Sequence, residues 1–327
     1  MKTARSARGL WRARIDGTRG DSRFAAVRRK PLTAPDRLAR EWKRGNVATD
    51  EELKGQQKKI WGGAAADWEK WDDWFEEQQV PVTDWLCTNA GLKPGMQVLD
   101  LAAGTGQPGF TAAGRVGSTG RVVSSDFAPE MVAAATRLSQ RKGITNVEHK
   151  EVDIENIPFP DASFDAVTCR FGLMFCPDPA RGAAEIARVL KPGGRFGLAV
   201  WDVPAQNAQF TSFTSALAEI APPPPPNPSA PGLFRLAAPG EFDSVLRAGG
   251  FVDFKIQSLA TEWEFSSPEN YWEIMTELAA PLKAAAATLP PETLARLRTA
   301  VIEGLRARHG SGPLRLLATP LCATGQK

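Results

Sequence analysis

The chain has 327 residues, of which 43% are hydrophobic and 24% are charged, and its formal net charge at pH 7 is +3. This composition is that of an ordinary globular protein, and the length suits one large α/β domain with insertions. No uninterrupted apolar run approaches the ~18 residues of a membrane-spanning helix, so we expect no membrane span.

The charge is unevenly distributed along the chain. Residues 1–50 hold 14 Lys and Arg against 5 Asp and Glu, whereas the remainder holds 26 against 32. The acidic body lacks the basic surface of a nucleic-acid enzyme, so we expect no nucleic-acid partner. The basic segment has no sustained apolar period, which predicts a poorly ordered extension outside the chemistry. An Arg-rich start also fits a transit peptide, although its acids and prolines weaken that alternative.

The four cysteines show no CxxC spacing, which argues against a zinc site and against a disulfide framework. They are Cys87, Cys169, Cys176 and Cys322. This cysteine usage predicts a reducing, cytoplasmic location. We interpret Cys169 and Cys176 as packing residues, because neither has an obvious base partner.

Two helices are expected before the first strand. Trp61, Trp68, Trp71 and Phe75 follow one another at spacings of seven, three and four, which predicts an aromatic stripe on one helix. Such a stripe is usually core, but it could equally form a lid over a cofactor pocket. A second helix over 82–90 ends before a Lys-Pro-Gly turn.

Residues 98–110 predict a strand, a glycine-rich loop and a helix that begins near Pro108. Gly104, Gly106 and Gly109 match the GxGxxG pattern, and Asp126 follows 20 residues after the second glycine. The pattern alone would suit a nicotinamide dinucleotide. Glycines here let the backbone turn sharply and approach a ligand closely.

Asp100 shifts the interpretation of this loop. A carboxylate near the end of the strand has no favourable interaction with an anionic pyrophosphate. S-adenosylmethionine carries an ammonium and a sulfonium and no phosphate. The acid therefore favours the cationic ligand. The alternative is that Asp100 only caps the following turn.

Strands and helices alternate beyond the loop. Strands are predicted at 120–126, 147–153, 163–169 and 195–201, with helices at about 129–141 and 179–190 between them. This order predicts a parallel sheet with right-handed crossovers, whose ligands bind at the carboxyl ends of the strands. Four residues should meet there: Asp100, Asp126, Asp153 and Arg170.

The motifs of this region carry a family resemblance. They are the loop, Asp126 after the second strand, Asp153-Ile154 before 157–161, Ser163-Phe164-Asp165 and the Leu-Lys-Pro-Gly-Gly of 190–194. As a set they resemble the motifs of class I S-adenosylmethionine-dependent methyltransferases. Phe171-Gly172-Leu173 is similar to the ubiquinone/menaquinone-biosynthesis group. The loop after the fourth strand lacks the Asn/Asp-Pro-Pro-aromatic motif of adenine and glutamine N-methyltransferases, which puts those substrates in doubt.

The resemblance implies an α/β fold with a Rossmann-like, doubly wound, seven-stranded and mostly parallel sheet, a final antiparallel strand and a helical cap insertion. It also implies S-adenosyl-L-methionine as cofactor and a set of binding residues. These are Asp100, Ala102, Gly104, Thr105, Gly106, Gln107, Asp126, Phe127, Met131, Asp153, Ile154 and Arg170.

Several of these residues have a role that the family suggests. Asp126 would accept hydrogen bonds from both ribose hydroxyls. Asp153 would take the adenine amine, with Phe127 and Met131 on either side of the ring, although these two could be ordinary core. Arg170 would contact the methionine end mainly through its backbone.

The rest of the chain should supply the acceptor pocket. A helix over 208–221, a stiff proline run at 222–226, a helix over 239–248 and a sixth strand over 251–259 are predicted. A helical segment over 267–308 resembles an inserted cap, and a final strand follows over 314–324. An apolar acceptor site could be lined by Trp263, Phe265, Tyr271, Trp272 and Met275, which as a set fit plain core equally well.

These expectations divide the chain into an extension (1–50), lid helices (51–96), a cofactor-binding core (97–202), a linker with a helix and the sixth strand (203–266), a cap (267–312) and the last strand (313–327). The predicted reaction is O-, C- or N-methylation of a small, largely apolar or aromatic acceptor by in-line displacement. We assign neither His149 nor His309 as a base, expect no metal, and leave the oligomeric state open.

Two other classes remain open. A NAD-dependent oxidoreductase would explain the glycines and Asp126, but neither Asp100 nor the lack of a proton relay. A catalytically silent cofactor-binding protein would keep the loop and Asp126 while its cap closed the acceptor site.

Overall fold

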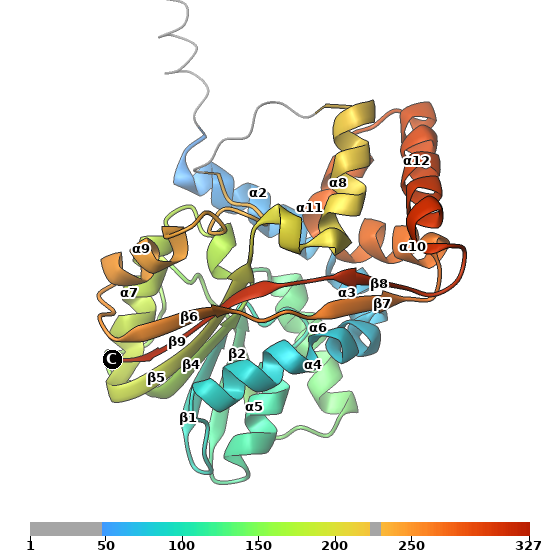
Figure 1. Ribbon diagram of the computed structural model, residues 1–327. Coiled ribbons are helices and arrows are strands. Elements are labelled where there is room, and N and C mark those ends of the chain that lie inside the picture. The colour runs from blue at the N-terminus through green and yellow to red at the C-terminus, as the bar shows by residue number, and fades with distance from the viewer. Residues whose placement is uncertain (1–47, 223–229) are drawn as a thin grey trace, which may run out of the picture. The chain divides into compact units, whose positions relative to one another are not determined.

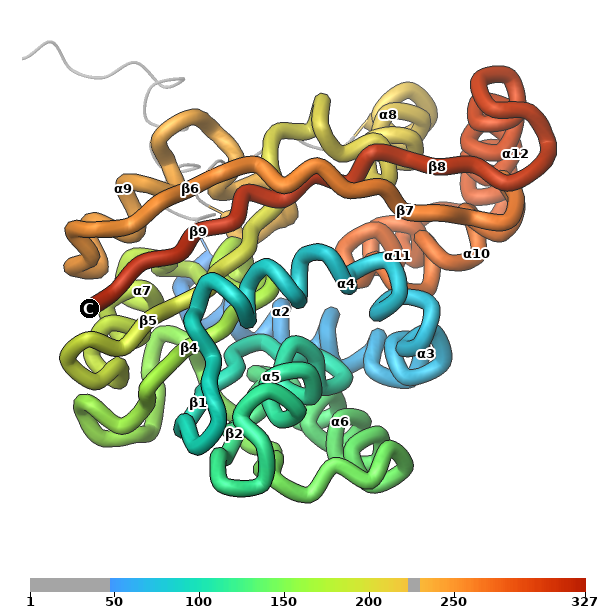
Figure 2. Tube along the Cα trace, turned by 60° about the horizontal axis from the view of Figure 1, so that its bottom comes forward, coloured from blue at the N-terminus to red at the C-terminus, as the bar shows by residue number. Residues whose placement is uncertain are grey.

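The computed structural model describes residues 48–222 and 230–327. The predicted basic extension lies outside the described residues apart from 48–50, and so does most of the proline run. Figures 1 and 2 show the arrangement of the described elements.

A seven-stranded sheet forms the centre, in the order β3-β2-β1-β4-β5-β9-β6. Strands β1 to β5 pair in parallel, and β9 is antiparallel to both β5 and β6. The bounds are β1 Gln97–Leu101, β2 Arg121–Asp126, β3 Val147–Glu151, β4 Phe164–Arg170, β5 Leu190–Trp201, β6 Phe254–Ser258 and β9 Pro320–Gln326. The predicted Rossmann-like sheet with a final antiparallel strand is confirmed.

Helices cover both faces of this sheet, and neighbouring residues of β5 show how. Gly197 lies against the backbone of Leu86 in α4 (Asp72–Asn89), while the ring of Phe196 lies 4.4 Å from that of Phe251 after α9 (Glu241–Ala248). Because successive strand residues point to opposite faces, α4 and α9 lie on different sides. The first side also carries α5 (Gly109–Val116), and the second carries α7 (Pro179–Val189), as Figure 1 shows.

The aromatic segment before β1 is not one helix, which corrects the prediction. It divides into α2 (Asp50–Gly62), α3 (Ala65–Lys70) and α4, with breaks at Gly63 and Trp71. The predicted second helix over 82–90 is the last part of α4. The aromatic rings still meet, because the helices fold back on one another: the Trp61 and Trp68 centroids lie 5.7 Å apart, and those of Trp68 and Phe75 lie 4.9 Å apart.

The C-terminal part also differs from its prediction. The segment expected to be continuous helix forms α10 (Pro268–Leu278), α11 (Ala280–Ala287) and α12 (Pro291–His309), and prolines lie near the start of each. The expected last strand forms two, because β8 (Leu314–Leu317) pairs with β7 (Glu262–Phe265) in a separate antiparallel sheet before β9 begins.

The remaining elements are the helices α6 (Pro129–Arg141) and α8 (Ala208–Ile220) and the short 3₁₀ turns η1 (Leu173–Phe175) and η2 (Pro204–Gln206). Helix α8 packs against α12. The four cysteines are free and buried. In the part of the chain that the structure describes, no helix is long and apolar enough to cross a bilayer.

Candidate active site

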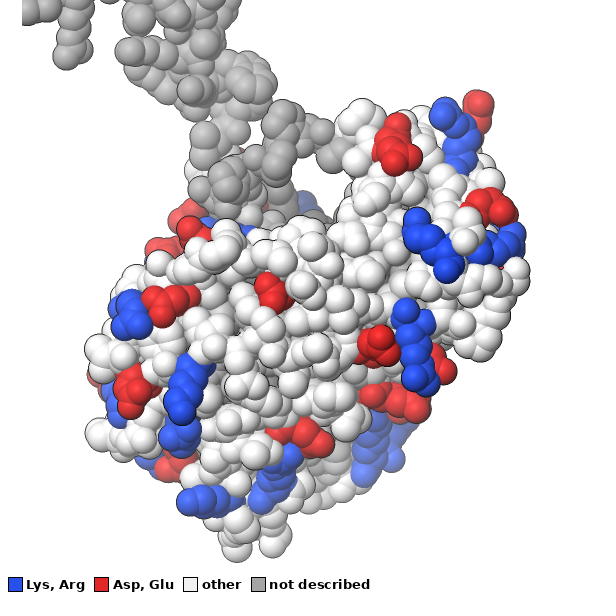
Figure 3. Space-filling model, viewed as in Figure 1, with Lys and Arg blue, Asp and Glu red and all other residues white. Residues whose placement is uncertain are grey.

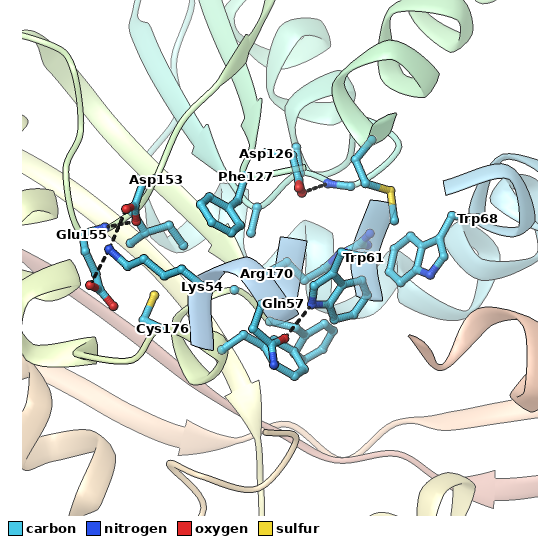
Figure 4. A pocket seen from close by; sticks show the side chains of 18 of the residues that line it. Lys54, Gln57, Trp61, Trp68, Asp126, Phe127, Asp153, Glu155, Arg170 and Cys176 are labelled. Carbon is cyan, nitrogen blue, oxygen red and sulfur yellow. Dashed lines mark hydrogen bonds and ion pairs between the residues drawn. The ribbon is translucent and has the colours of Figure 1, made fainter. Parts of the chain in front are cut away.

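A cavity of about 110 Å³ lies at the carboxyl ends of β1, β2, β3 and β4, where ligands of parallel sheets bind (Figure 4). Nine of the twelve predicted residues line it: Ala102, Gly104, Gln107, Asp126, Phe127, Met131, Asp153, Ile154 and Arg170. The residues come from four strand ends and their loops, so the sheet brings distant parts of the sequence together.

Asp100 does not line the cavity, which corrects the prediction that it faces a cationic ligand. Its side chain is fully buried, and its carboxylate accepts hydrogen bonds from the Gly109 amide (2.7 Å) and the Thr168 hydroxyl (2.6 Å). Burial raises the pKa of Asp100 to about 7, against the lowering effect of these bonds and of Arg170. Asp100 therefore anchors the start of α5, as the alternative interpretation proposed.

Thr105 and Gly106 also lie outside the cavity lining. The Thr105 hydroxyl is buried and donates to Asp72 Oδ1 in α4 at 2.8 Å. Gly106 has a φ of +125°, and a Cβ there would overlap the Phe110 ring at 2.1 Å. Both residues hold the loop in shape, because one ties it to α4 and the other lets Phe110 pack beneath it.

Asp126 is the last residue of β2, and the glycine-rich loop after β1 holds its carboxylate in place. Its carboxylate accepts hydrogen bonds from the amides of Gly104 and Ala128, both at 2.9 Å (Figure 4 shows the bond to the loop). Burial raises the pKa of Asp126, while the amides of Ala128, Gly104 and Phe127 lower it. The acid is thus held rigidly beside the cavity with lone pairs to spare for a ligand.

Asp153 follows β3, and it forms an ion pair with the same lysine as Glu155. Lys54 of α2 reaches Asp153 at 2.7 Å and Glu155 at 2.8 Å (Figure 4). The Glu155 side chain is only 2% exposed and also accepts from the Asp178 amide at 2.7 Å. The lysine therefore neutralises a buried acid and an acid that faces the cavity.

The Arg170 guanidinium is bonded to side chains of α4. It forms an ion pair with Glu76 and donates a hydrogen bond to the Thr83 hydroxyl at 2.8 Å. Its carbon atom lies 5.2 Å from the Phe75 ring centroid, within cation–π range. These contacts occupy the Arg170 guanidinium, and the backbone contact with the methionine end of the cofactor that the resemblance implies stays a prediction.

Aromatic side chains form the remaining wall. They are Trp61, Trp68, Phe75, Phe171 and Phe175. Trp61 packs edge-on against Phe175 at 5.1 Å, and Phe171 stacks on Trp201 at 3.9 Å. The wall is apolar and excludes water from one side of the cavity.

The five residues predicted as an acceptor lining lie elsewhere. Trp263, Phe265, Tyr271, Trp272 and Met275 are absent from the cavity lining, and all but the partly buried Trp272 are buried. The Tyr271 hydroxyl donates to the Gln209 carbonyl at 2.8 Å. Of the two alternatives, the plain core fits these residues in the structure, because the α10 side chains pack against α8 and β7.

Lys54 and Gln57 of α2 line the cavity but are not among the predicted site residues, whereas Trp61 belongs to the stripe that could form a lid. Lys54, Gln57 and Trp61 line the cavity from one face of that helix. Their spacing of three and four is a helical period, so the signal was present. This spacing was not recognised because two of the three side chains are polar. The aromatic stripe also predicted a helix that begins further along the chain.

Comparison with known families agrees with this geometry. A family described as "Methyltransferase domain" matches residues 92–221, from the turn before β1 to the end of α8. The match covers less than half of the chain, and over this stretch the chain is similar to that family. The resemblance to class I methyltransferases that the motifs indicated is confirmed.

Relatives of the methyltransferase domain support the same assignment. A ubiquinone/menaquinone biosynthesis C-methyltransferase of Francisella philomiragia is 42% identical over 115 residues, which is 35% of this chain and 46% of the relative. An uncharacterized protein of Mycobacterium tuberculosis is 37% identical over 126 residues, 38% of this chain and 44% of the relative. The chain thus matches less than half the length of either.

A solved structure shows the fold. Phosphoethanolamine N-methyltransferase 2 of Haemonchus contortus, in complex with S-adenosylhomocysteine, superposes with a TM-score of 0.50 at 16% identity. The match covers 85% of this chain and 60% of that one. Because 85% of this chain is covered, the shared fold extends beyond residues 92–221.

Proposed function

We propose that the chain is an S-adenosylmethionine-dependent methyltransferase that acts on a small, largely apolar or aromatic acceptor. The observation that carries the proposal is the Asp126 carboxylate, fixed at the end of β2 beside the cavity of a methyltransferase domain. The Francisella relative and the Haemonchus structure are both named as methyltransferases, which supports the same reaction class.

The residues present fit the cofactor. Asp126 offers acceptors for ribose hydroxyls, and Asp153 offers one for the adenine amine. Phe127 and Met131 supply apolar surfaces for the ring. Gly104, with a φ of +56°, brings backbone close to the cavity where a Cβ would come within 3.1 Å of Trp68. The bound group would supply a methyl on a positively charged sulfur, and the C–S bond would break as the methyl joins the acceptor, leaving a neutral thioether.

The protein's own part is alignment and exclusion of water. The aromatic wall holds an apolar acceptor by stacking and edge contacts. Among the described residues that line the cavity there is no histidine or tyrosine to take a proton. The acids of the lining, Asp126, Asp153 and Glu155, are already held by backbone amides or by Lys54. We therefore expect acceptors that need little base assistance, with positioning supplying much of the rate. The Francisella relative is named as a C-methyltransferase of ubiquinone/menaquinone biosynthesis, which supports carbon as the methylated atom.

The central test is removal of the Asp126 carboxylate. Asp126→Ala should weaken S-adenosylmethionine binding at least tenfold in calorimetric titration, because charge-assisted hydrogen bonds are lost. Asp84→Ala, which removes an exposed α4 acid paired with Arg115, is the control and should leave the affinity unchanged. Equal affinity in the wild type and Asp126→Ala would contradict the proposal.

Two assays separate the alternative functions. Nicotinamide dinucleotide binding without S-adenosylmethionine binding would establish an oxidoreductase instead. Labelled-methyl transfer to a panel of quinols, phenols, indoles and amines would identify the acceptor class, and cofactor binding without transfer to any of them would favour a silent binding protein.

A further inference from the structure

The acid expected to face the positive sulfur of S-adenosylmethionine does not line the cavity. Asp100 is buried and bonded within the core. Among the described residues that line the cavity, the acids are Asp126, Asp153 and Glu155, and Glu155 is paired with Lys54. A cation removed from water without a partner is unfavourable. The sulfonium therefore needs a partner other than Asp100.

The order of the strands indicates where the sulfur would lie. Strands β3, β2, β1 and β4 are neighbours in that order, with Asp153 after β3, Asp126 at the end of β2 and Gly104 after β1. Adenine and sulfur leave the ribose on opposite sides of its ring. With the adenine at Asp153 and the ribose at Asp126, as proposed above, the cofactor continues toward β1 and β4. The sulfur would then lie beside the Gly104 loop.

Two tryptophans, Trp61 and Trp68, line the cavity at this end (Figure 4). The Trp68 ring lies against the loop, since a Cβ at Gly104 would come within 3.1 Å of it. The Trp61 ring lies 5.7 Å from that of Trp68, with the two planes 77° apart. It also packs against Phe175, beyond the end of β4, at 5.1 Å. The two indoles therefore border the expected place of the sulfur from two directions.

Both indoles are held by their own N–H groups. Trp61 Nε1 donates to Gln57 Oε1 at 3.2 Å, and Trp68 Nε1 donates to the Leu278 carbonyl at 2.8 Å. Because these polar atoms are already engaged, each side chain offers a ligand its π surface. The face of an aromatic ring is negative, and tryptophan attracts a cation more strongly than the other aromatic side chains do. The two rings can thus take the place of an acid.

We propose that Trp61 and Trp68 attract the positive sulfur and thereby select the charged methyl donor over its neutral demethylated product. The product has the same adenosine and amino-acid ends, so contacts at Asp126 and Asp153 do not distinguish the two. The rings supply the difference, because cation–π attraction is lost when the methyl leaves. They therefore favour release of the product after transfer. This inference rests on the proposed function, since it concerns the cofactor of the same site.

The test measures the affinities of three ligands for the full chain by calorimetric titration. S-adenosylmethionine carries a sulfonium and sinefungin an ammonium at this point, whereas S-adenosylhomocysteine is neutral there. Trp61→Leu and Trp68→Leu should each lower the affinity of both cationic ligands relative to S-adenosylhomocysteine at least threefold, because leucine is apolar but has no π face. Trp61→Phe and Trp68→Phe, which keep a ring, should stay within twofold of the wild-type ratios.

Trp71→Leu is the matched control. Trp71 belongs to the same aromatic stripe but is absent from the cavity lining, and its N–H donates to Glu277 at 2.6 Å. This change should leave both affinity ratios as they are in the wild type. Urea denaturation checks the folding of each variant. Trp61 is only partly buried, so Trp61→Leu carries the test if Trp68→Leu does not fold.

The outcomes separate this inference from the proposed function. Leucine variants that keep the wild-type ratios would overturn the inference and leave the proposed function intact. A loss seen with S-adenosylmethionine but not with sinefungin would also overturn it, because it would indicate packing around the methyl group and not attraction to the charge. A wild type that binds none of the three ligands would contradict the proposed function itself, and the inference with it.

Discussion

Asp100 shows how one residue can match a motif and yet perform a different task. Asp100 connects three elements, because it lies in β1, and its carboxylate accepts from Gly109, the first residue of α5, and from Thr168 in β4. A buried acid with such partners stabilises the loop geometry on which Gly104 and Asp126 depend. It influences the ligand site only through the backbone that it holds.

The raised pKa of Asp100 gives a pH-dependent stability. Since the folded value of about 7 lies above the unfolded value near 3.8, the folded state retains a proton that the unfolded state loses. The contribution of Asp100 to stability is therefore full below about pH 4 and is lost as the pH rises through 7. Urea denaturation from pH 5 to 7 should show the wild type losing stability relative to Asp100→Asn. A constant difference between the two proteins would contradict this assignment.

At the scale of elements, α2 is attached to the domain by charge more than by apolar burial. None of its residues is fully buried. It is capped by Thr49 and Glu52, and its links to the sheet edge are Lys54 with Asp153 and Glu155, and Lys58 with Glu151. A helix with so little buried surface depends on such contacts for its position. Because the same helix lines the cavity, its attachment determines how the cavity is closed.

The two lysines of α2 should differ sharply in their effects. Lys54→Met leaves the buried Glu155 without its cation and should lower the free energy of unfolding by about 3 kcal/mol, as breaking a buried pair does. Lys58→Met removes a pair whose side chains are 39% and 50% exposed and should cost less than about 1 kcal/mol. Urea denaturation of the two variants measures both, and equal losses would show that Glu155 does not need Lys54.

Across the whole molecule, the layers are set by close backbone contacts as well as by apolar side chains. Charged side chains of both signs are scattered over the face shown in Figure 3. Inside, α4 lies directly on β5, where a Cβ at Gly197 would come within 2.6 Å of the Leu86 carbonyl oxygen. This contact positions α4, which carries Phe75, Gln79 and the partners of Arg170 and Thr105.

Gly197→Ala should therefore disturb the whole domain. The added methyl meets backbone that cannot turn aside, so we expect a loss of roughly 2 kcal/mol in the free energy of unfolding. Gly114→Ala is the control, because that helical position is open and alanine there should stabilise by up to about 1 kcal/mol. Thermal and urea denaturation of the two variants check these opposite signs, and a neutral Gly197→Ala would show that the helix can shift at no cost.

The sequence by itself determined the alternation of strands and helices, the glycine loop, and the acids at the ends of β2 and β3. These follow from local periodicity and from turn residues, whose conformations depend on near neighbours. Asp126 and Asp153 were predictable because parallel strands end at one edge, which places residues at successive strand ends together.

Only the tertiary structure decided what each side chain touches. In the structure Asp100 points into the core, where it accepts from Gly109. Trp61, Trp68 and Phe75 lie on three different helices whose packing brings their rings together. Lys54, 99 positions before Asp153 in the chain, pairs with it. The tertiary structure also set the predicted acceptor residues of the cap away from the cavity. The physical reason is that burial and partner choice depend on packing between elements distant in sequence, which no local pattern encodes.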